Sequence, residues 1–264
     1  MFPPERIVCL TEETVETLYL LGEQDRIVGI SGYVVRPPEA RRDKPRVSAF
    51  TSARIDKILA LKPDLVLTFS DLQAEIAAEL IRHGVAVHGF NQRSVAGILT
   101  MIRMVGATEK ADRLAETLTK RLCEIRRLGE NQSLRPKIYF EEWDEPMISG
   151  IGWVSELIEI AGGIDIFADR AKQAAAKDRI VTSEAVIAAK PDIILASWCG
   201  KKVVIPKIMD RAGWSGIPAV AAGRIQEIKS SIILQPGPAA LTDGLDAILA
   251  ALQQHAMTSS CLRR

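Results

Sequence analysis

Four cysteines and three histidines are the side chains in this sequence best suited to nucleophilic or metal chemistry. Cys9, Cys123, Cys199 and Cys261 are widely scattered, without the CxxC spacing of a zinc site or the dense framework of a disulfide-rich domain. We therefore expect unpaired thiols. Cys199, which follows a predicted strand, leaves one alternative open, a thiol-dependent enzyme.

The histidines are equally dispersed along the chain. A tetrahedral metal site needs ligands that converge, and the spacing of His83, His88 and His255 gives no sign of this. We expect no metal site and no catalytic cofactor. Whether His88, in a predicted strand, contacts a ligand stays open.

Two pairs of adjacent glutamates resemble candidates for acid–base catalysis. Glu141 and Glu142 lie in a predicted strand, where neighbouring side chains point to opposite faces and cannot act on one bond. Glu12 and Glu13 fall in the first turn of a predicted helix, where the helix dipole favours carboxylates. GxSxG, P-loop, HExxH and GxGxxG motifs are absent as well, so we do not expect an enzyme.

The charge balance excludes several classes of partner. The chain has 34 basic and 33 acidic residues, a net charge of +1, and no basic patch of the kind that binds nucleic acid. It is 47% hydrophobic and has no apolar run near the ~18 residues that span a bilayer. The start, MFPPERIVCL, has no signal-peptide pattern, so we expect a cytoplasmic protein if Met1 is the native start.

One phrase occurs twice in the sequence. ILALKPDLVLTF begins at Ile58 and VIAAKPDIILAS at Val186, and their lysines, Lys62 and Lys190, are 190 − 62 = 128 residues apart. In each copy an amphipathic helix meets a proline, which cannot continue it, and an apolar run follows that is typical of a buried parallel strand. The repeat predicts two α/β lobes built alike.

The remaining pattern agrees with two Rossmann-like lobes that have parallel-rich sheets, are joined by one long helix and hold a ligand cleft between them. We expect an N-terminal lobe over 1–107, the connecting helix over 108–131, a C-terminal lobe over 132–256 and a disordered tail over 257–264. Strands are expected at 6–10, 27–31, 47–50, 65–69, 85–90, 137–143, 193–197 and 225–229.

Aromatic residues stand at the ends of the predicted strands. Phe50 and Phe69 do so in the first half, Trp143 and Trp198 in the second, and Tyr33 follows another strand in a loop. Ligands of parallel α/β sheets lie beyond the carboxyl ends of the strands. These five residues therefore favour a flat apolar wall for a large planar ligand, although each on its own is equally consistent with the core beneath it.

The motifs RIVCLTEETVETLYLLG, RVSAF, IDKILALKPDLVLTF, ISGIGWVSELIEIAGG and LQPGPAALTDGLDAIL resemble, in this order, the cobalamin- and ferric-siderophore-binding proteins of ABC importers. The resemblance extends from about Arg6 to Leu252 and is strongest to the cobalamin-binding branch. It implies two α/β lobes joined by a rigid helix, and non-catalytic binding of cobalamin or a related corrinoid.

The resemblance also implies which residues meet the ligand. Tyr33, Phe50, Phe69 and Trp143 match the aromatic contacts, although Phe50 and Phe69 stand where cobalamin binders carry tryptophan. The loop Ser230–Gln235 stands where the family places polar contacts, but here it is rather apolar. The expected ligand-binding set is completed by three further residues, Trp153, Trp198 and Gln235.

An ABC transporter permease is the implied partner. In the family an acid at the start of the equivalent short helix in each lobe docks onto the permease, and Asp56 and Glu184 occupy those positions. The same acids also stabilise a helix end without any partner. We expect a monomer, and the resemblance implies that it delivers ligand from the periplasm.

Two other ligand or compartment assignments remain open. A ferric siderophore or haem would use the same fold, with Arg36, Arg93 and Arg170 as candidates to bind an anionic chelator. The missing leader also leaves a cytoplasmic corrinoid carrier or sensor as an alternative.

Overall fold

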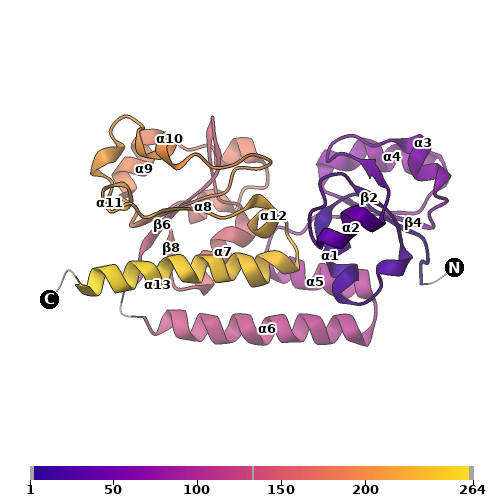
Figure 1. Cartoon of the computed structure of the whole chain (residues 1–264), viewed down its shortest axis with the longest axis horizontal. Coiled ribbons are helices and arrows are strands. Elements are labelled where there is room, and N and C mark those ends of the chain that lie inside the picture. The colour runs from indigo at the N-terminus through magenta and orange to yellow at the C-terminus, as the bar shows by residue number, and fades with distance from the viewer. Residues whose placement is uncertain (1–2, 133, 262–264) are drawn as a thin grey trace. The chain divides into compact units, whose positions relative to one another are not determined.

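Short apolar segments alternate with amphipathic ones along the chain, and in the computed structural model they form two α/β units (Figure 1). The structure describes residues 3–132 and 134–261. The first unit contains the chain up to Gln92 together with Ala96–Thr117, and the second contains Arg93–Val95 and the chain from Leu118 onward. The expected α/β class with parallel-rich sheets is confirmed.

The sheet of the first unit is entirely parallel, with strand order β3-β2-β1-β4-β5. The three inner strands, β1, β2 and β4, are short and largely apolar, as expected for strands covered on both faces, whereas the edge strands β3 and β5 contain Arg46 and His88. Along the chain they are β1 (Ile7–Cys9), β2 (Ile27–Ser31), β3 (Arg46–Ser48), β4 (Leu65–Phe69) and β5 (Val87–Phe90).

Helices cover both faces of this sheet. Figure 1 shows α3 and α4 on one side and α1 and α5 on the other. Ile58 of α3 and Leu80 of α4 pack on Val8 and Val66 of the strands, and all four are fully buried. The helices are α1 (Glu12–Leu20), α2 (Pro38–Asp43), α3 (Ile55–Ala60), α4 (Ala74–Arg82) and α5 (Val95–Gly106).

Helix α6 (Glu109–Glu130) is the long helix expected from the sequence. Ala111, Ala115, Leu118 and Leu122 are buried along one stripe, at the three- and four-residue spacing of an amphipathic helix. The boundary of the two units falls inside this helix, after Thr117.

The sheet of the second unit has the strand order β10-β9-β6-β7, with β8 also paired to β6. All pairings are parallel except the β6–β7 hairpin. The sequence did not predict β7 or β8. The strands are β6 (Lys137–Asp144), β7 (Met147–Ser149), β8 (Ile164–Asp165), β9 (Ile193–Ala196) and β10 (Ile225–Glu227).

Helices also flank the second sheet, with α9 and α10 on one side and α7 and α13 on the other in Figure 1. Trp214 and Tyr139 are fully buried in the core on the α9 side. The helices are α7 (Gly152–Ile160), α8 (Ala168–Ala171), α9 (Ser183–Ala189), α10 (Ile205–Met209), α11 (Pro218–Ala221), α12 (Ser230–Ile233) and α13 (Leu245–Cys261).

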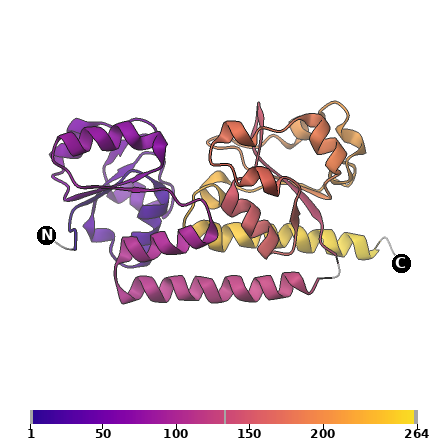
Figure 2. The same ribbon diagram turned by 180° about the vertical axis from the view of Figure 1, so that it is seen from behind.

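The closing helix is longer than the sequence predicted. A π-helical turn, Ala240–Gly244, leads directly into α13, which continues through 257–261, where a disordered tail was expected. The last three residues of that expected tail, 262–264, lie outside the described residues. In Figure 2 the C-terminal part of α6 runs alongside α13, and Arg121 there donates to the Leu241 carbonyl oxygen at 2.9 Å.

The repeated Lys-Pro-Asp phrase has the same structure in both units. Lys62 and Lys190 end α3 and α9 with positive φ angles of 48° and 50°, because the following proline disfavours the α conformation for the residue before it. Asp64 then accepts hydrogen bonds from the amides of Glu5 and Arg6, just before β1. Asp192 accepts one from the first amide of β6 at 2.8 Å. The aspartate therefore fastens each repeated strand to its neighbour.

For the described part of the chain, every helix is too short or too polar to cross a membrane.

Candidate ligand-binding site

The first sheet changes winding direction beside β1, because β2 and β3 follow on one side and β4 and β5 on the other. Ligands of open α/β sheets bind at the carboxyl edge of such a switch point. Gln73, almost fully buried, lies there. Its Oε1 accepts from the Phe69 amide at 2.9 Å, and its Nε2 donates to the carbonyl oxygens of Leu10 and Phe50 at 3.3 and 2.7 Å.

Gln73 therefore brings two expected ligand contacts together. Phe69 ends β4 and is 6% exposed, whereas Phe50, in the loop after β3, is half-buried. Gln73 lies in a 3₁₀ turn after Ser70, whose φ is +57° and whose Oγ accepts from the Leu72 amide. Gln73 was not predicted as a site residue from the sequence. A polar residue four positions beyond a buried strand was its only signal.

Tyr33 stands on the loop after β2 with 64% of its surface exposed. Its amide donates to Ser31 Oγ at 3.3 Å, and two residues later the Val35 amide donates to Glu12 Oε2 at 2.8 Å. The start of α1 thus holds this loop in place and leaves the phenol ring available to a ligand.

Glu12 is buried, not solvent-exposed as acids in a first helical turn usually are. Burial raises the pKa of Glu12 to about 8, with smaller contributions from Glu16 and Glu13, although the Val35 amide opposes the change. Its Oε1 is buried and has no hydrogen-bond partner in the described part of the chain. At neutral pH this carboxyl group is therefore largely protonated.

Glu13 and Glu16 are buried beside it. Burial also raises the pKa of Glu13 to about 7, while the Thr11 hydroxyl donates to its Oε1 at 2.7 Å and works in the opposite direction. Glu16 is paired with Arg36 at 3.1 Å. The start of α1 thus holds three buried carboxyl groups, of which Glu16 has a cationic partner and the other two have raised pKa values.

In the second unit, three acids near the end of β6, Glu141, Glu142 and Asp144, are buried or partly buried and each has a cationic partner. Glu141 is fully buried and accepts two hydrogen bonds from Arg211, at 2.5 and 3.0 Å. The indole of Trp198 donates to it at 3.0 Å and the phenol of Tyr139 at 3.2 Å. Each Glu141 oxygen has two donors, so this carboxylate is structural.

Glu142 points to the other face of the strand, as the alternation of side chains predicts. It accepts two hydrogen bonds from Arg179, at 2.5 and 3.0 Å. Arg179 is 1% exposed and also donates to the Ser149 carbonyl oxygen of β7. The two adjacent glutamates thus serve separate ion pairs and do not face one bond.

Asp144 is the last residue of β6, and its carboxylate forms ion pairs with the ammonium groups of Lys201 at 2.5 Å and Lys207 at 2.9 Å. Burial alone would raise the pKa of Asp144, but the two lysines outweigh it and lower the pKa to about 2. Lys201 Nζ also lies over the rings of Trp143, 4.0 Å from the centroid, and Trp198, at 4.9 Å. These two expected ligand contacts are therefore neighbours.

The tryptophans differ in what they offer a ligand. Trp143 is half-buried, whereas Trp198 is 2% and Trp153 3% exposed. The Trp153 indole donates to the Ile233 carbonyl oxygen at 2.9 Å, two residues before half-buried Gln235. Trp153 and Trp198 are thus anchored below the surface, and Trp143 is the indole that a ligand can reach.

Asp56 and Glu184, expected to dock on a permease, occupy the first turns of α3 and α9. Both are solvent-exposed, and Asp56 is paired with Arg54 at 3.3 Å. Neither acid is needed by the core, so both are available to a partner.

Metal binding and thiol catalysis gain no support from this structure. No group of three or more histidine, cysteine or acidic side chains in the described residues is placed to hold a metal ion. Burial raises the pKa of the Cys199 thiol and Glu142 adds to the effect, the opposite of what an activated nucleophile needs. The ring of His88 packs against that of Phe90, with 4.4 Å between the two ring centroids.

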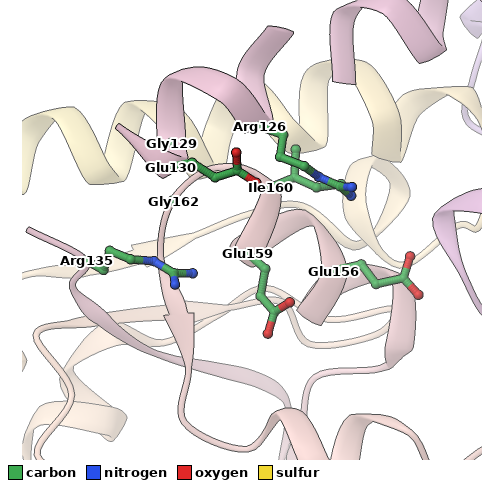
Figure 3. A pocket seen from close by; sticks show the side chains of 8 residues that line it. All are labelled: Arg126, Gly129, Glu130, Arg135, Glu156, Glu159, Ile160 and Gly162. Atoms are coloured by element: carbon green, nitrogen blue, oxygen red, sulfur yellow. The ribbon is translucent and has the colours of Figure 1, made fainter. Parts of the chain in front are cut away.

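A separate cavity of about 330 Å³ lies at the other edge of the second sheet (Figure 3). Arg126 and Glu130 come from α6, Glu156 and Glu159 from α7, and Arg135 from the segment before β6. Glu156 accepts from the Val95 amide at 2.8 Å, and Arg135 donates to the Gly163 carbonyl oxygen at 2.9 Å. Its position at the amino end of β6 separates it from the strand ends described above.

Comparison with known proteins identifies related chains. Residues 7–232 match the family model described as periplasmic binding protein. A vitamin B12-binding protein of Vibrio cholerae is 27% identical over 249 residues, 91% of this chain and 86% of that protein. An uncharacterized ABC transporter substrate-binding lipoprotein of Bacillus subtilis is 26% identical over 258 residues, 93% of this chain and 79% of that protein.

Among solved structures, the apo periplasmic heme-binding protein of Roseiflexus superposes with a TM-score of 0.79 at 26% identity, covering 94% of this chain and 98% of that one.

Proposed function

Because the chain belongs to the periplasmic binding protein family, we propose that it binds cobalamin or a related corrinoid without converting it, as the substrate-binding component of an ABC importer. The observation that carries this proposal is the set of aromatic side chains at the carboxyl ends of the strands. Phe50 and Phe69 are held by one buried amide, and Trp143 is the reachable indole of the second unit.

A corrin ring is a broad, flat and largely apolar surface, and aromatic side chains are the groups that pack best against it. The candidate rings of the first unit are Tyr33, Phe50 and Phe69, and the candidate ring of the second unit is Trp143. Within the second unit, Trp198 neighbours Trp143 under the Lys201 ammonium group, and the Trp153 indole holds the Ile233 carbonyl oxygen two residues before Gln235. We include these three residues in the proposed ligand-binding set. The similarity to the vitamin B12-binding protein of V. cholerae over most of both chains supports the choice of ligand.

We assign Asp56 and Glu184 to docking on the permease. Their positions in the two copies of the repeat, at the start of α3 and α9, and their exposure support this role. Exposed charges of this kind mainly change association rates and their salt dependence. Substituting both with alanine should therefore slow association with the permease and leave ligand affinity unchanged.

Delivery to an importer requires the protein to work on the outer face of the cytoplasmic membrane. Cell fractionation of the natively expressed protein tests this compartment. Recovery in the cytoplasm would favour a corrinoid carrier or sensor in place of an import component.

A haem or ferric chelate is the second candidate ligand, favoured by the similarity to the heme-binding protein of Roseiflexus. Titration with cyanocobalamin and with hemin, followed by tryptophan quenching, separates the two. Phe69→Ala and Trp143→Ala should each weaken the corrinoid complex about 10-fold, the value of one lost aromatic contact. Leu128→Ala, at an exposed position on α6, is the matched control. Equal affinity of all three variants would remove the assigned site.

A further inference from the structure

The acids at the end of β6 differ in the number of cations that pair with them. Glu141 and Glu142 each have one arginine, bound through two hydrogen bonds, whereas Asp144 is shared by Lys201 and Lys207. Asp144 is therefore the acid of this strand that has two cationic partners, both of them lysines.

The lysines are the accessible members of this set. The side chains of Lys201 and Lys207 are 40% and 43% exposed, but that of Asp144 is 1% exposed. Lys207 has a second acid, Glu145, at 3.5 Å. For Lys201 the described residues provide no acid besides Asp144.

The backbone directs Lys201 over the indoles. Gly200, at φ +74°, turns the chain after Trp198, and the Lys201 amide then donates to the Trp198 carbonyl oxygen at 3.3 Å. The Trp143 ring is held by its own indole N–H, which donates to the Glu145 carbonyl oxygen at 2.8 Å. The ammonium group thus lies over the Trp143 ring, the indole of this unit that is only half-buried.

We propose that Lys201 recognises an anionic group of the ligand, a carboxylate or a phosphate, and moves off Trp143 when it does so. This inference rests on the proposed function. Anion recognition and ring stacking on Trp143 then occur together, and a planar ligand without a suitably placed anion leaves the ammonium over the indole.

Lys207 makes this movement possible. Stripping a buried carboxylate of its only counter-ion is strongly unfavourable. Asp144 keeps Lys207 at 2.9 Å when Lys201 leaves, so no bare charge remains. Arg179 and Arg211 have no such replacement, because their departure would leave Glu142 or fully buried Glu141 unpaired. Lys201 is therefore the cation of this set that can leave its acid and bind an anionic group of the ligand.

The test compares Lys201→Met with Lys202→Met, the neighbouring exposed lysine, so that both variants lose one charge. Three probes are titrated at low and high salt: cyanocobalamin, which has a phosphodiester, dicyanocobinamide, which lacks it, and hemin, which has two carboxylates. Circular dichroism and thermal unfolding establish that both variants fold.

We expect Lys201→Met to weaken cyanocobalamin binding at least about 10-fold, the value of one hydrogen bond to a charged group. Dicyanocobinamide binding should stay the same or become tighter, because this probe has no phosphodiester for Lys201 and the variant uncovers Trp143. Lys202→Met should affect neither probe. If hemin binds and cyanocobalamin does not, the corrinoid proposal fails, and a loss of hemin affinity in Lys201→Met still supports anion recognition. Unchanged affinity of Lys201→Met for the anionic probe that binds overturns the inference alone. Absence of binding by all three probes overturns both.

Discussion

Gln73→Ala removes the amide that joins the ends of β1 and β4 to the Phe50 loop. The Phe69 amide loses its acceptor at 2.9 Å, and the carbonyl oxygens of Leu10 and Phe50 lose their donors at 3.3 and 2.7 Å. Each hydrogen bond contributes about 1 kcal/mol, and the site is buried, so the free energy of unfolding should fall by about 3 kcal/mol. Ligand affinity should fall too, because Phe50 and Phe69 are no longer held together.

Two further variants isolate the cause. Gln73→Glu keeps the acceptor for the Phe69 amide but presents oxygens to both carbonyls, so its loss of stability should be at least as large. Gln226→Ala removes a surface hydrogen bond to Gln254 and should cost less than about 0.5 kcal/mol.

The assay is urea unfolding, combined with hydrogen exchange of the Phe69 amide. Exchange reports on the site itself, even if the two units unfold separately. A loss below about 1 kcal/mol for Gln73→Ala, with unchanged exchange at Phe69, would refute the role given to this residue.

Three other changes test separate parts of the structure. Asp192→Ala should lower the free energy of unfolding by about 1–2 kcal/mol in urea, because the first amide of β6 loses its acceptor. Glu12→Gln should raise the melting temperature at pH 8 and change it little at pH 4.5. The pKa of Glu12 is raised on folding, so wild-type stability is full below about pH 4.5 and declines as pH rises toward 8. Gly152→Ala places a Cβ 2.4 Å from the Arg93 carbonyl oxygen and should cost about 1–3 kcal/mol, whereas Gly216→Ala meets nothing within 4 Å.

Each of these three predictions is contradicted if the variant is as stable as the wild-type protein under the stated conditions. Asp192→Ala with unchanged stability would remove the fastening role of the repeat, and a pH-independent effect of Glu12→Gln would mean that this carboxyl is ionised throughout. Equal melting temperatures for the two glycine variants would show that Gly152 does not pack closely against the Arg93 carbonyl oxygen.

The sequence predicted the features that depend on local pattern. The Lys-Pro-Asp phrase marked both helix-to-strand joints because proline, apolar runs and their spacing act within a few residues. Strands β7 and β8 escaped prediction because β7 lies between Pro146 and Gly150 and β8 follows Gly162 and Gly163, and prolines and glycines at these places indicate turns.

Long-range pairing could not be predicted. Lys201 and Arg211 meet their acids across 57 and 70 residues of sequence, and nothing in SWCGKK indicates that Asp144 is the partner. First-turn acids have the same pattern whether exposed or buried, so the burial of Glu12 was not visible in the sequence. The same holds for Trp153 and Trp198, whose indoles are covered only after folding.

Equilibrium dialysis of the purified chain against cyanocobalamin, with spectra of the recovered corrinoid, tests the central claim most directly. We predict saturation at one equivalent with a dissociation constant of about 1 μM or tighter, and an unaltered corrinoid after release. Absence of binding at about 100 μM, or recovery of a chemically changed corrinoid, would contradict a non-catalytic corrinoid-binding protein.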